Sequence, residues 1–494
     1  MYKIYFVCYF IIIINFSKSE KLIFASLHSR HGARAPLDCN ENNLDFLGEK
    51  WTNPGQLTPT GQRMEYILGL RNNQRYIKGK PYKFLSEKFD PHEILVYSTD
   101  VNRTILSISS QLQGLYPMSS KAGYTLNEEQ IKVSNPPVNI NSYEDIQKEI
   151  ENLNISSLPN FMTIIPIHTL TTSERKMNVQ DSVGCKEKVN KTRDNNKISI
   201  QTIINAAEKF NSKYSKNLNN YYDQNPSNFT YDFDWIGLFC DTMVSDISDG
   251  RKMTDFFSRT GIDKDELEKD CREVIEINFR DDFYGDEKNQ VSSLVESNLI
   301  KDILYYMNLK IDEDKNNEIQ GKNVSDYSKP KMTIYSGHDS TLSGEEMFMI
   351  RNFGLKDTDF IYPTYTTQFA FEVTRNDEKP DKIEYTDYTV KFYINDKLFI
   401  SRNFQEFKDI ILEKAWSSKQ INEFCEIKEE EEDEDEDDAN SIEIYIIIGL
   451  AVLSLILVIV VIFLVKKLIK LNKKENENED NERKESSLLD EEEN

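Results

Sequence analysis

The chain has 494 residues, enough to bury a substantial core in one or two domains. Its formal net charge at pH 7 is −24, because 60 lysines and arginines are outnumbered by 84 aspartates and glutamates. So acidic a protein is not expected to bind nucleic acid, and any affinity for phosphate must come from a local cluster of basic side chains.

An apolar leader begins the chain. Lys3 precedes an apolar run that ends at Ile14, and small residues follow near Ser17–Ser19. A positive residue, a short apolar core and small residues are typical of a secretory signal peptide, and this core is too short to span a membrane. We therefore predict a signal peptide at residues 1–18.

The first predicted strand ends in a cluster of positive charge. Residues Leu22–Pro36 read LIFASLHSRHGARAP, in which a strand-like apolar run leads to Arg30, His31 and Arg34. Guanidinium groups donate paired hydrogen bonds to a tetrahedral oxyanion such as phosphate, and they do not lose their charge. A histidine between them can act as a nucleophile or a base. Gly32 allows the backbone to turn or to approach a ligand closely.

A helix is predicted soon after this cluster. Thr58 suits the N-cap and Pro59 suits the first helical position. The helix should run to about Asn73. Three apolar side chains are expected on its buried face: Met64, Ile67 and Leu68.

Two further predicted strands lead into polar residues. Ile94–Ser98 is followed by Thr99–Arg103, and apolar residues at helical spacing begin at Val101. Met332–Ser336 is followed by Gly337–Thr341. Ligands of open α/β sheets bind at the carboxyl ends of the strands, so the three strand ends predict one shared site.

The chain between about residues 120 and 330 has a different character. It is rich in Asn, Lys, Asp and Glu, and it contains amphipathic stretches such as Ile198–Tyr214 and Val291–Met307 that predict helices. Beyond it, Phe369–Val373 and Val390–Ile394 return to a strand-like pattern.

The last part of the chain predicts a membrane anchor. Glu429–Asp438 is an unbroken acidic run that cannot collapse, so residues 427–443 are expected to form a solvated stalk. Ile444–Val465 carries no charge and would span about 33 Å as a helix, enough to cross a bilayer. Lysines follow at once, so the positive-inside rule assigns residues 466–494 to the cytoplasm. We predict a single-pass type I membrane protein.

Cysteines and glycosylation sequons agree with a secreted domain. Cys8 lies in the leader, and the remaining five cysteines are an odd number for an oxidising compartment. Cys240 is expected to pair with either Cys271 or Cys39. Glycosylation is predicted at Asn154, Asn190, Asn228 and Asn323.

Five segments, in order along the chain, carry a family resemblance. They are SRHGARAP (Ser29–Pro36), GQLTPTGQRMEYILG (Gly55–Gly69), VYSTDVNRTILS (Val96–Ser107), PIH (Pro166–His168) and YSGHDSTLSG (Tyr335–Gly344). The chain resembles the histidine acid phosphatases of the prostatic and lysosomal type, in the phosphoglycerate-mutase-like superfamily, over roughly Lys21–Cys425. The resemblance implies an α/β fold at residues 19–426. A sheet flanked by helices would carry a smaller, mainly helical cap at about 120–330.

The resemblance also implies roles for single residues. His31 would be the nucleophile that forms a phosphohistidine, and Asp339 would be the general acid that protonates the leaving alcohol. The phosphate would be bound by Arg30, Arg34, Arg103 and His338. Since guanidinium groups can neutralise a transferred phosphoryl group, neither a metal nor another cofactor is expected. A disulfide between Cys185 and Cys425 is implied as well.

The chain departs from the family pattern in two places. Asn102 stands where the family usually has an aspartate before the arginine, and Asn102-Arg103-Thr104 is also a sequon. A glycan there would crowd the phosphate pocket, so we predict that Asn102 is unmodified. Gly337–Thr341 reads GHDST where AHDTT is commoner, which keeps both functional side chains.

The remaining motifs are assigned more modest roles. His28 is expected to pack in the sheet and His92 to lie in a surface loop. His168 has either a structural role near the site or a contact with substrate. In the tail, Glu485–Leu489 resembles an acidic dileucine signal that would direct the protein to endosomes or lysosomes.

Together these patterns predict a membrane-anchored acid phosphatase for phosphate monoesters, either small molecules or phosphoproteins. A phytase or inositol-polyphosphate phosphatase is an alternative, whose pocket would need additional basic residues. A catalytically silent receptor or adhesion ectodomain is another, although a binding module needs no general acid. The catalytic domain would be lumenal or extracellular, on a lysosomal, endosomal or cell-surface membrane, and a homodimer is compatible with the family.

Overall fold

The computed structural model describes residues 20–37, 51, 53–79, 82–136, 144–170, 187–189, 191, 197–222, 230–284, 291–320, 330–376 and 383–426. The chain forms two compact units, 1–427 and 428–494, and every described residue belongs to the first. No described helix is both long enough and apolar enough to cross a membrane.

Several predictions fall outside the described residues. They are the signal peptide at 1–18, the stalk at 427–443, the membrane helix at 444–465 and the tail at 466–494 with its Glu485–Leu489 motif. Five single residues named in the predictions also lie outside the described residues: Cys39, Cys185, Asn190, Asn228 and Asn323.

In the described part of the chain, the strands form one mixed sheet in the order β3-β2-β4-β1-β5-β6-β7. The first four strands of that order run parallel, and β5 pairs antiparallel with β1. The carboxyl ends of β1, β2 and β4 therefore meet at one edge, as predicted. The strands are β1 (Glu20–Arg30), β2 (Ile94–Thr99), β3 (His168–Leu170), β4 (Met332–Gly337), β5 (Gln368–Asn376), β6 (Tyr388–Ile394) and β7 (Lys397–Asn403).

Helices cover both faces of the sheet. On one face, Leu27 and Ile334 share a hydrophobic cluster with Ile108 and other side chains of α2 and α3. On the other face, Phe24 and Phe371 join a cluster with side chains of α11, α12 and α13. Central strands buried on both faces explain the nearly continuous apolar runs of β1 and β4. These helices are α2 (Pro59–Tyr76), α3 (Asn102–Leu115), α11 (Val291–Gln320), α12 (Asp339–Asn352) and α13 (Phe404–Lys414).

Helix α2 begins as predicted but buries a different face. The Thr58 hydroxyl accepts a hydrogen bond from the Gly61 amide, and Pro59 opens the helix. Ile67, expected inside, is 54% exposed, so that expectation was wrong. Helix α3 packs instead against the face of α2 that carries the small residue Gly69. A Cβ on Gly69 would lie 1.9 Å from the Gln111 carbonyl oxygen. The buried residues of α2 are Gly61, Glu65, Gly69, Asn72, Asn73 and Tyr76.

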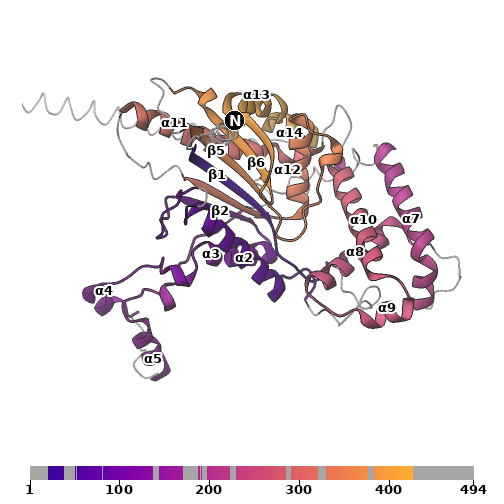
Figure 1. Ribbon diagram of the computed structural model, residues 1–494, viewed down its shortest axis with the longest axis horizontal. Helices are drawn as coiled ribbons and strands as arrows, with labels where there is room; N and C mark the ends of the chain where they lie inside the picture. Colours follow the sequence, from indigo (N-terminus) through magenta and orange to yellow (C-terminus); the bar gives the residue numbers. More distant parts are fainter. Residues whose placement is uncertain are drawn as a thin grey trace, which may run out of the picture. The chain divides into compact units, whose positions relative to one another are not determined.

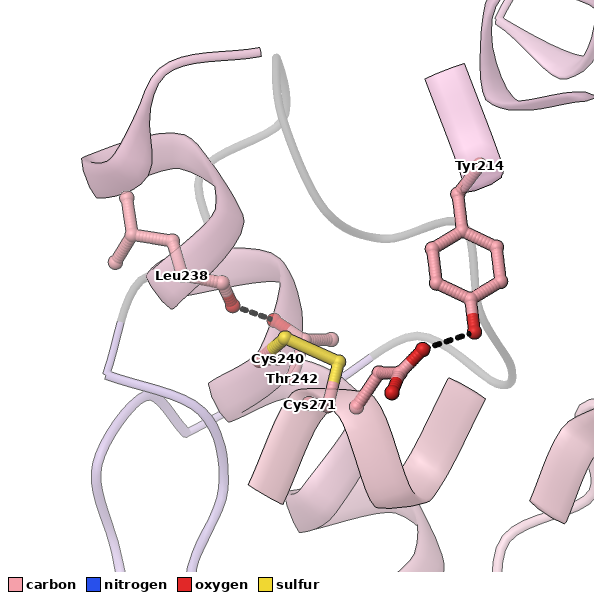
Figure 2. The surroundings of a disulfide bond; sticks show 6 residues. Tyr214, Leu238, Cys240, Thr242 and Cys271 are labelled. Atoms are coloured by element: carbon pink, nitrogen blue, oxygen red, sulfur yellow. Dashed lines mark hydrogen bonds between the residues drawn. A yellow bond between two sulfur atoms is a disulfide. The ribbon is translucent and has the colours of Figure 1, made fainter. Parts of the chain in front are cut away.

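A group of helices from the range predicted for the cap lies beside the sheet, and we call its members the cap helices (Figure 1). It has its own hydrophobic cluster around Phe239, Met243 and Phe256. A disulfide joins Cys240 to Cys271, which decides between the two pairings left open by the sequence. Figure 2 shows this bond beside Tyr214, whose hydroxyl donates to Asp270 at 2.7 Å. The cap helices are α7 (Lys197–Tyr221), α8 (Phe233–Ser248), α9 (Thr254–Thr260) and α10 (Lys264–Tyr284).

Cys425 and helix α11 bear on two earlier predictions. Cys425, at the end of α14, is also disulfide-bonded, and its pairing with Cys185 stays a prediction. Helix α11 falls in the 120–330 range predicted for the cap, yet it packs against the sheet.

The remaining elements are short. The short α-helices are α4 (Glu128–Val133), α5 (Glu144–Leu153) and α14 (Ser418–Cys425). The 3-10 turns are Met118–Ser120, Pro159–Phe161, Asp357–Asp359 and Tyr385–Asp387.

Candidate active site

The predicted site residues converge at the carboxyl edge of β1, β2 and β4. Arg30 is the last residue of β1, and the amide of His31 donates to the Gly337 carbonyl at the end of β4, at 3.1 Å. The rings of His31 and His338 are 5.6 Å apart between centroids. Adjacent parallel strands thus bring together side chains that lie about 300 positions apart in the sequence.

The imidazole of His31 is held in one tautomer. Its Nδ1 lies 2.9 Å from the Gly32 carbonyl oxygen, and because a carbonyl can only accept, Nδ1 carries the proton. The lone pair is therefore on Nε2. Burial, and then the positive charges of Arg30 and Arg34, hold the pKa of His31 well below its ordinary 6.5. His31 is a neutral imidazole with a free Nε2, as a nucleophile must be.

Three guanidinium groups lie around this imidazole: those of Arg30 and Arg34 are buried, and that of Arg103 is partly buried. Arg30 lies over the ring of Tyr365, 4.3 Å from its centroid, and donates to the Pro363 carbonyl at 2.8 Å. Arg34 makes a two-pronged ion pair with Asp241, at 3.1 and 2.9 Å. The Nε atoms of Arg30, Arg34 and Arg103 are all buried without a hydrogen-bond partner. An oxyanion could accept hydrogen bonds from such unused donors.

His338 contacts Arg103 and the end of β2. Its Nδ1 accepts from Nη2 of Arg103 at 3.2 Å, and its Nε2 donates to the Thr99 hydroxyl at 3.0 Å. Burial, and then the charge of Arg103, lower the pKa of His338 to about 3. Burial and the neighbouring Arg34 lower the pKa of Arg103 to about 10. Both ring nitrogens are thus engaged, with Arg103 and with Thr99, and the role of His338 in binding phosphate stays a prediction.

Asp339 opens helix α12 and is the carboxylate of the site. Its Oδ2 lies 2.7 Å from Nη2 of Arg30 and accepts from the Tyr362 hydroxyl at 3.1 Å, and its Oδ1 accepts from the Ser340 amide at 2.9 Å. Burial raises the pKa of Asp339, but attraction by Arg30 and Arg34 outweighs burial and lowers it overall. The helix N-terminus favours the same ionised form.

A cavity of about 670 Å³ opens above these residues. His31, Arg34, Arg103, His338 and Asp339 form its floor. The walls include side chains of α8 and α10, together with Leu37, Val101, Ser340 and Tyr362. The volume is in the range of small-molecule binding sites.

Sequence reasoning missed three residues that contact the site: Asp241, Tyr362 and Tyr365. The two tyrosines lie just before β5, and because β5 is antiparallel to β1, its amino end meets the same sheet edge. That topology was a usable signal. Asp241 lies 207 positions from Arg34, and no local pattern marks it as a partner.

Other candidate residues lie outside the cavity lining. His28 is buried in the sheet, where its Nδ1 lies 2.9 Å from Glu345. His92 and His168 are exposed. Asn102 is exposed at the start of α3, and Asn154 lies exposed in a turn. In the described ranges, no group of three or more His, Cys, Asp or Glu side chains could hold a metal ion.

Comparison with known proteins supports the same picture. The family model for the histidine phosphatase superfamily (branch 2) matches residues 21–395. Lysosomal acid phosphatase of Xenopus laevis is 30% identical over 151 residues, which are 31% of this chain and 33% of that protein. Prostatic acid phosphatase of Bos taurus is 25% identical over 334 residues, 67% of this chain and 69% of that protein.

One solved structure shows the shared fold. The phytase from Citrobacter braakii superposes with a TM-score of 0.51 at 11% sequence identity, covering 82% of this chain and 99% of the phytase. At that identity the likeness concerns the fold alone.

Proposed function

Because this chain belongs to the histidine phosphatase superfamily (branch 2), we propose that it is an acid phosphatase that hydrolyses phosphate monoesters through a phosphohistidine on His31. One observation carries the proposal. The Gly32 carbonyl fixes the proton on Nδ1, so that Nε2 carries its lone pair beside three arginines whose Nε atoms are buried without a hydrogen-bond partner. Phosphoryl transfer depends mainly on positioning and charge stabilisation, which this arrangement supplies.

In the first step the substrate phosphate would be bound by Arg30, Arg34 and Arg103. Nε2 of His31 attacks phosphorus, a nitrogen–phosphorus bond forms, and the bond from phosphorus to the ester oxygen breaks. Asp339 gives its proton to the departing oxygen, so the alcohol leaves neutral.

Asp339 must hold a proton for this step, although Arg30 keeps it ionised in the empty site. A bound phosphate competes for Arg30 and brings negative charge close to the carboxylate. Both effects raise the pKa of Asp339, because like charges disfavour ionisation. Acidic surroundings then supply the proton, which accounts for a phosphatase that works at low pH.

In the second step water hydrolyses the phosphohistidine. Asp339, now a carboxylate, takes a proton from the water as it attacks phosphorus. The nitrogen–phosphorus bond breaks, and its electron pair returns to Nε2 of His31. Inorganic phosphate leaves, Asp339 releases the proton to solvent as it pairs again with Arg30, and the site regains its starting state.

We place the enzyme on a membrane, anchored by Ile444–Val465, with residues 19–426 lumenal or extracellular. Relatives named lysosomal acid phosphatase support an acidic lysosomal or endosomal compartment. The phytase-like fold leaves a phytase as the second candidate. A silent receptor is disfavoured, because the buried neutral imidazole and the adjacent carboxylate have no use in a binding module.

The proposal is tested by phosphate release from 4-nitrophenyl phosphate at pH 5 by the full-length protein. We expect His31→Ala to lose at least ~10³-fold in kcat, while His92→Ala, an exposed histidine outside the site, keeps full activity. Rapid quenching in alkali should trap labelled phosphate on the wild type and not on His31→Ala. Equal activity of His31→Ala and wild type would refute the phosphohistidine.

A further inference from the structure

Two cap helices form a wall of the cavity opposite the arginine floor. On α8, the residues that line the cavity recur at spacings of one, three, one and three, so they lie on one helix face: Phe233, Asp234, Gly237, Leu238 and Asp241. The lining residues of α10 form a similar face: Val274, Ile275, Asn278 and Phe279. Most of these side chains are apolar. They are suited to contact the organic part of a substrate rather than its phosphate.

Gly237 keeps space open in this wall. A Cβ built on Gly237 meets no atom within 4 Å, whereas one on Gly69 would collide with the backbone of α3. Gly237 does not have a positive φ. Neither packing nor backbone conformation therefore requires glycine here, although glycine weakens a helix interior relative to alanine. The open space at Gly237 belongs to the cavity.

The charges of the wall are negative. Among the described lining residues, the arginines are Arg34 and Arg103, both on the floor. The ionisable side chains of the wall are Asp241, which is paired with Arg34, and Asp234, which is exposed. Among the described lining residues of this wall, a second phosphate would meet the Asp234 carboxylate and no cation.

We propose that this wall is the leaving-group subsite, that it takes the flat apolar or aromatic group of a monophosphate ester, and that Gly237 and Asp234 determine its specificity. The proposal rests on the proposed phosphatase activity. Gly237 leaves room for the organic group beside Phe233 and Phe279. Asp234 disfavours polyphosphorylated substrates at the cavity wall.

The steric role of Gly237 is tested with the full-length Gly237→Leu variant on 2-naphthyl phosphate and methyl phosphate at pH 5. We expect kcat/KM for the naphthyl ester to fall at least tenfold, while that for methyl phosphate stays within threefold of wild type. Ser258→Leu, which introduces the same side chain at an exposed position of α9 outside the cavity lining, is the control and should retain the wild-type preference. An equal change for both esters, or no change, would overturn the steric role.

The electrostatic role of Asp234 is tested with the Asp234→Lys variant on phytate and 2-naphthyl phosphate. We expect the ratio of kcat/KM for phytate to that for the naphthyl ester to rise at least fivefold. Asp265→Lys makes the same charge change in the first turn of α10, outside the cavity lining, and should leave the ratio unchanged. Equal shifts in the two variants would overturn the role of Asp234.

These outcomes are separable from failure of the proposed function. A wild type that releases phosphate from none of the three esters refutes the phosphatase, and the subsite with it. If phosphate release depends on His31 but neither substitution changes the substrate preference of the wild type, the subsite alone is refuted. If Gly237→Leu does not fold, Asp234→Lys still decides.

Discussion

At the scale of single residues, the neighbours of His31 determine its protonation. An ordinary histidine titrates near pH 6.5 and is mostly a cation at pH 5, where it has no free lone pair. His31 is buried among Arg30, Arg34 and Arg103, so its pKa lies well below that value. The guanidinium groups that would bind phosphate therefore also keep the nucleophile neutral in acid.

This protonation predicts a pH profile. As pH falls from 6.5 to 5, kcat/KM for 4-nitrophenyl phosphate should not decline, because His31 stays unprotonated throughout that window. An unshifted histidine would lose roughly tenfold for each pH unit below 6.5. Initial rates at low substrate concentration measure the profile, and a fall of that size would contradict the low pKa.

Asp339→Asn should separate substrates by their leaving groups. An alkyl alcohol is a poor leaving group and needs the proton, so its phosphate ester should lose ~10²–10⁴-fold in kcat. 4-Nitrophenolate leaves without protonation, so its ester should lose far less. Steady-state rates on glycerol phosphate and 4-nitrophenyl phosphate make the comparison, and equal losses on both would count against Asp339 as the general acid.

At the scale of elements, the contact between α2 and α3 shows why apolar spacing mispredicted a helix face. The expectation for Ile67 assumed that large apolar side chains face the core. The structure instead packs Gly69 of α2 against Gly114 of α3, where a Cβ on Gly114 would lie 2.1 Å from the Tyr66 carbonyl oxygen. Close approach of two backbones selects for small residues, and hydrophobic periodicity does not detect it.

Gly69→Ala should therefore destabilise the protein by about 1–3 kcal/mol, because its Cβ forces the two helices apart. Gly237→Ala is the matched control within a helix, and its Cβ meets nothing. It should be neutral or stabilising by up to ~1 kcal/mol. Urea denaturation of both variants tests the pair, and equal effects would refute the steric explanation. Since α3 carries Arg103, we also expect Gly69→Ala to lower activity.

At the scale of the whole molecule, buried carboxyl groups couple stability to pH. Glu65, Glu296 and Glu346 are at most 3% exposed, and neither oxygen of Glu65 has a hydrogen-bond partner. Burial, reinforced for Glu296 and Glu346 by neighbouring glutamates, raises the pKa of each well above 4.5. Above pH 4.5 the unfolded chain loses these protons while the folded protein retains them, so stability falls as pH rises toward the folded pKa values.

The Tm should accordingly fall as pH is raised from 6.5 to 8. Below 6.5 two histidines, His31 and His338, act in the opposite sense, because their lowered pKa values favour the unfolded state in acid. Well above pH 6.5 the unfolded histidines are neutral too, so their opposing effect fades and the buried carboxyl groups dominate the slope. Glu65→Gln should flatten the decline, while Glu128→Gln, an exposed control, should leave it unchanged. Thermal unfolding at several pH values measures it, and a constant Tm would contradict the burial of protonated carboxyls.

Much of this protein is determined by local sequence. The strand-like runs at β1, β2 and β4 and the amphipathic stretches at α7 and α11 form the expected elements, because side-chain periodicity selects strand or helix within a few residues. The strand-end motifs could be assigned to one edge because parallel strands align their carboxyl ends.

The tertiary structure decided what depends on distant partners. It paired Arg34 with Asp241, chose Cys271 as the partner of Cys240, and brought α8 to the wall of the cavity. It also buried Glu65 where both oxygens lack partners. Such contacts join residues far apart in the sequence, and their energy depends on burial and geometry that exist only once the chain has folded, so no local pattern contains them.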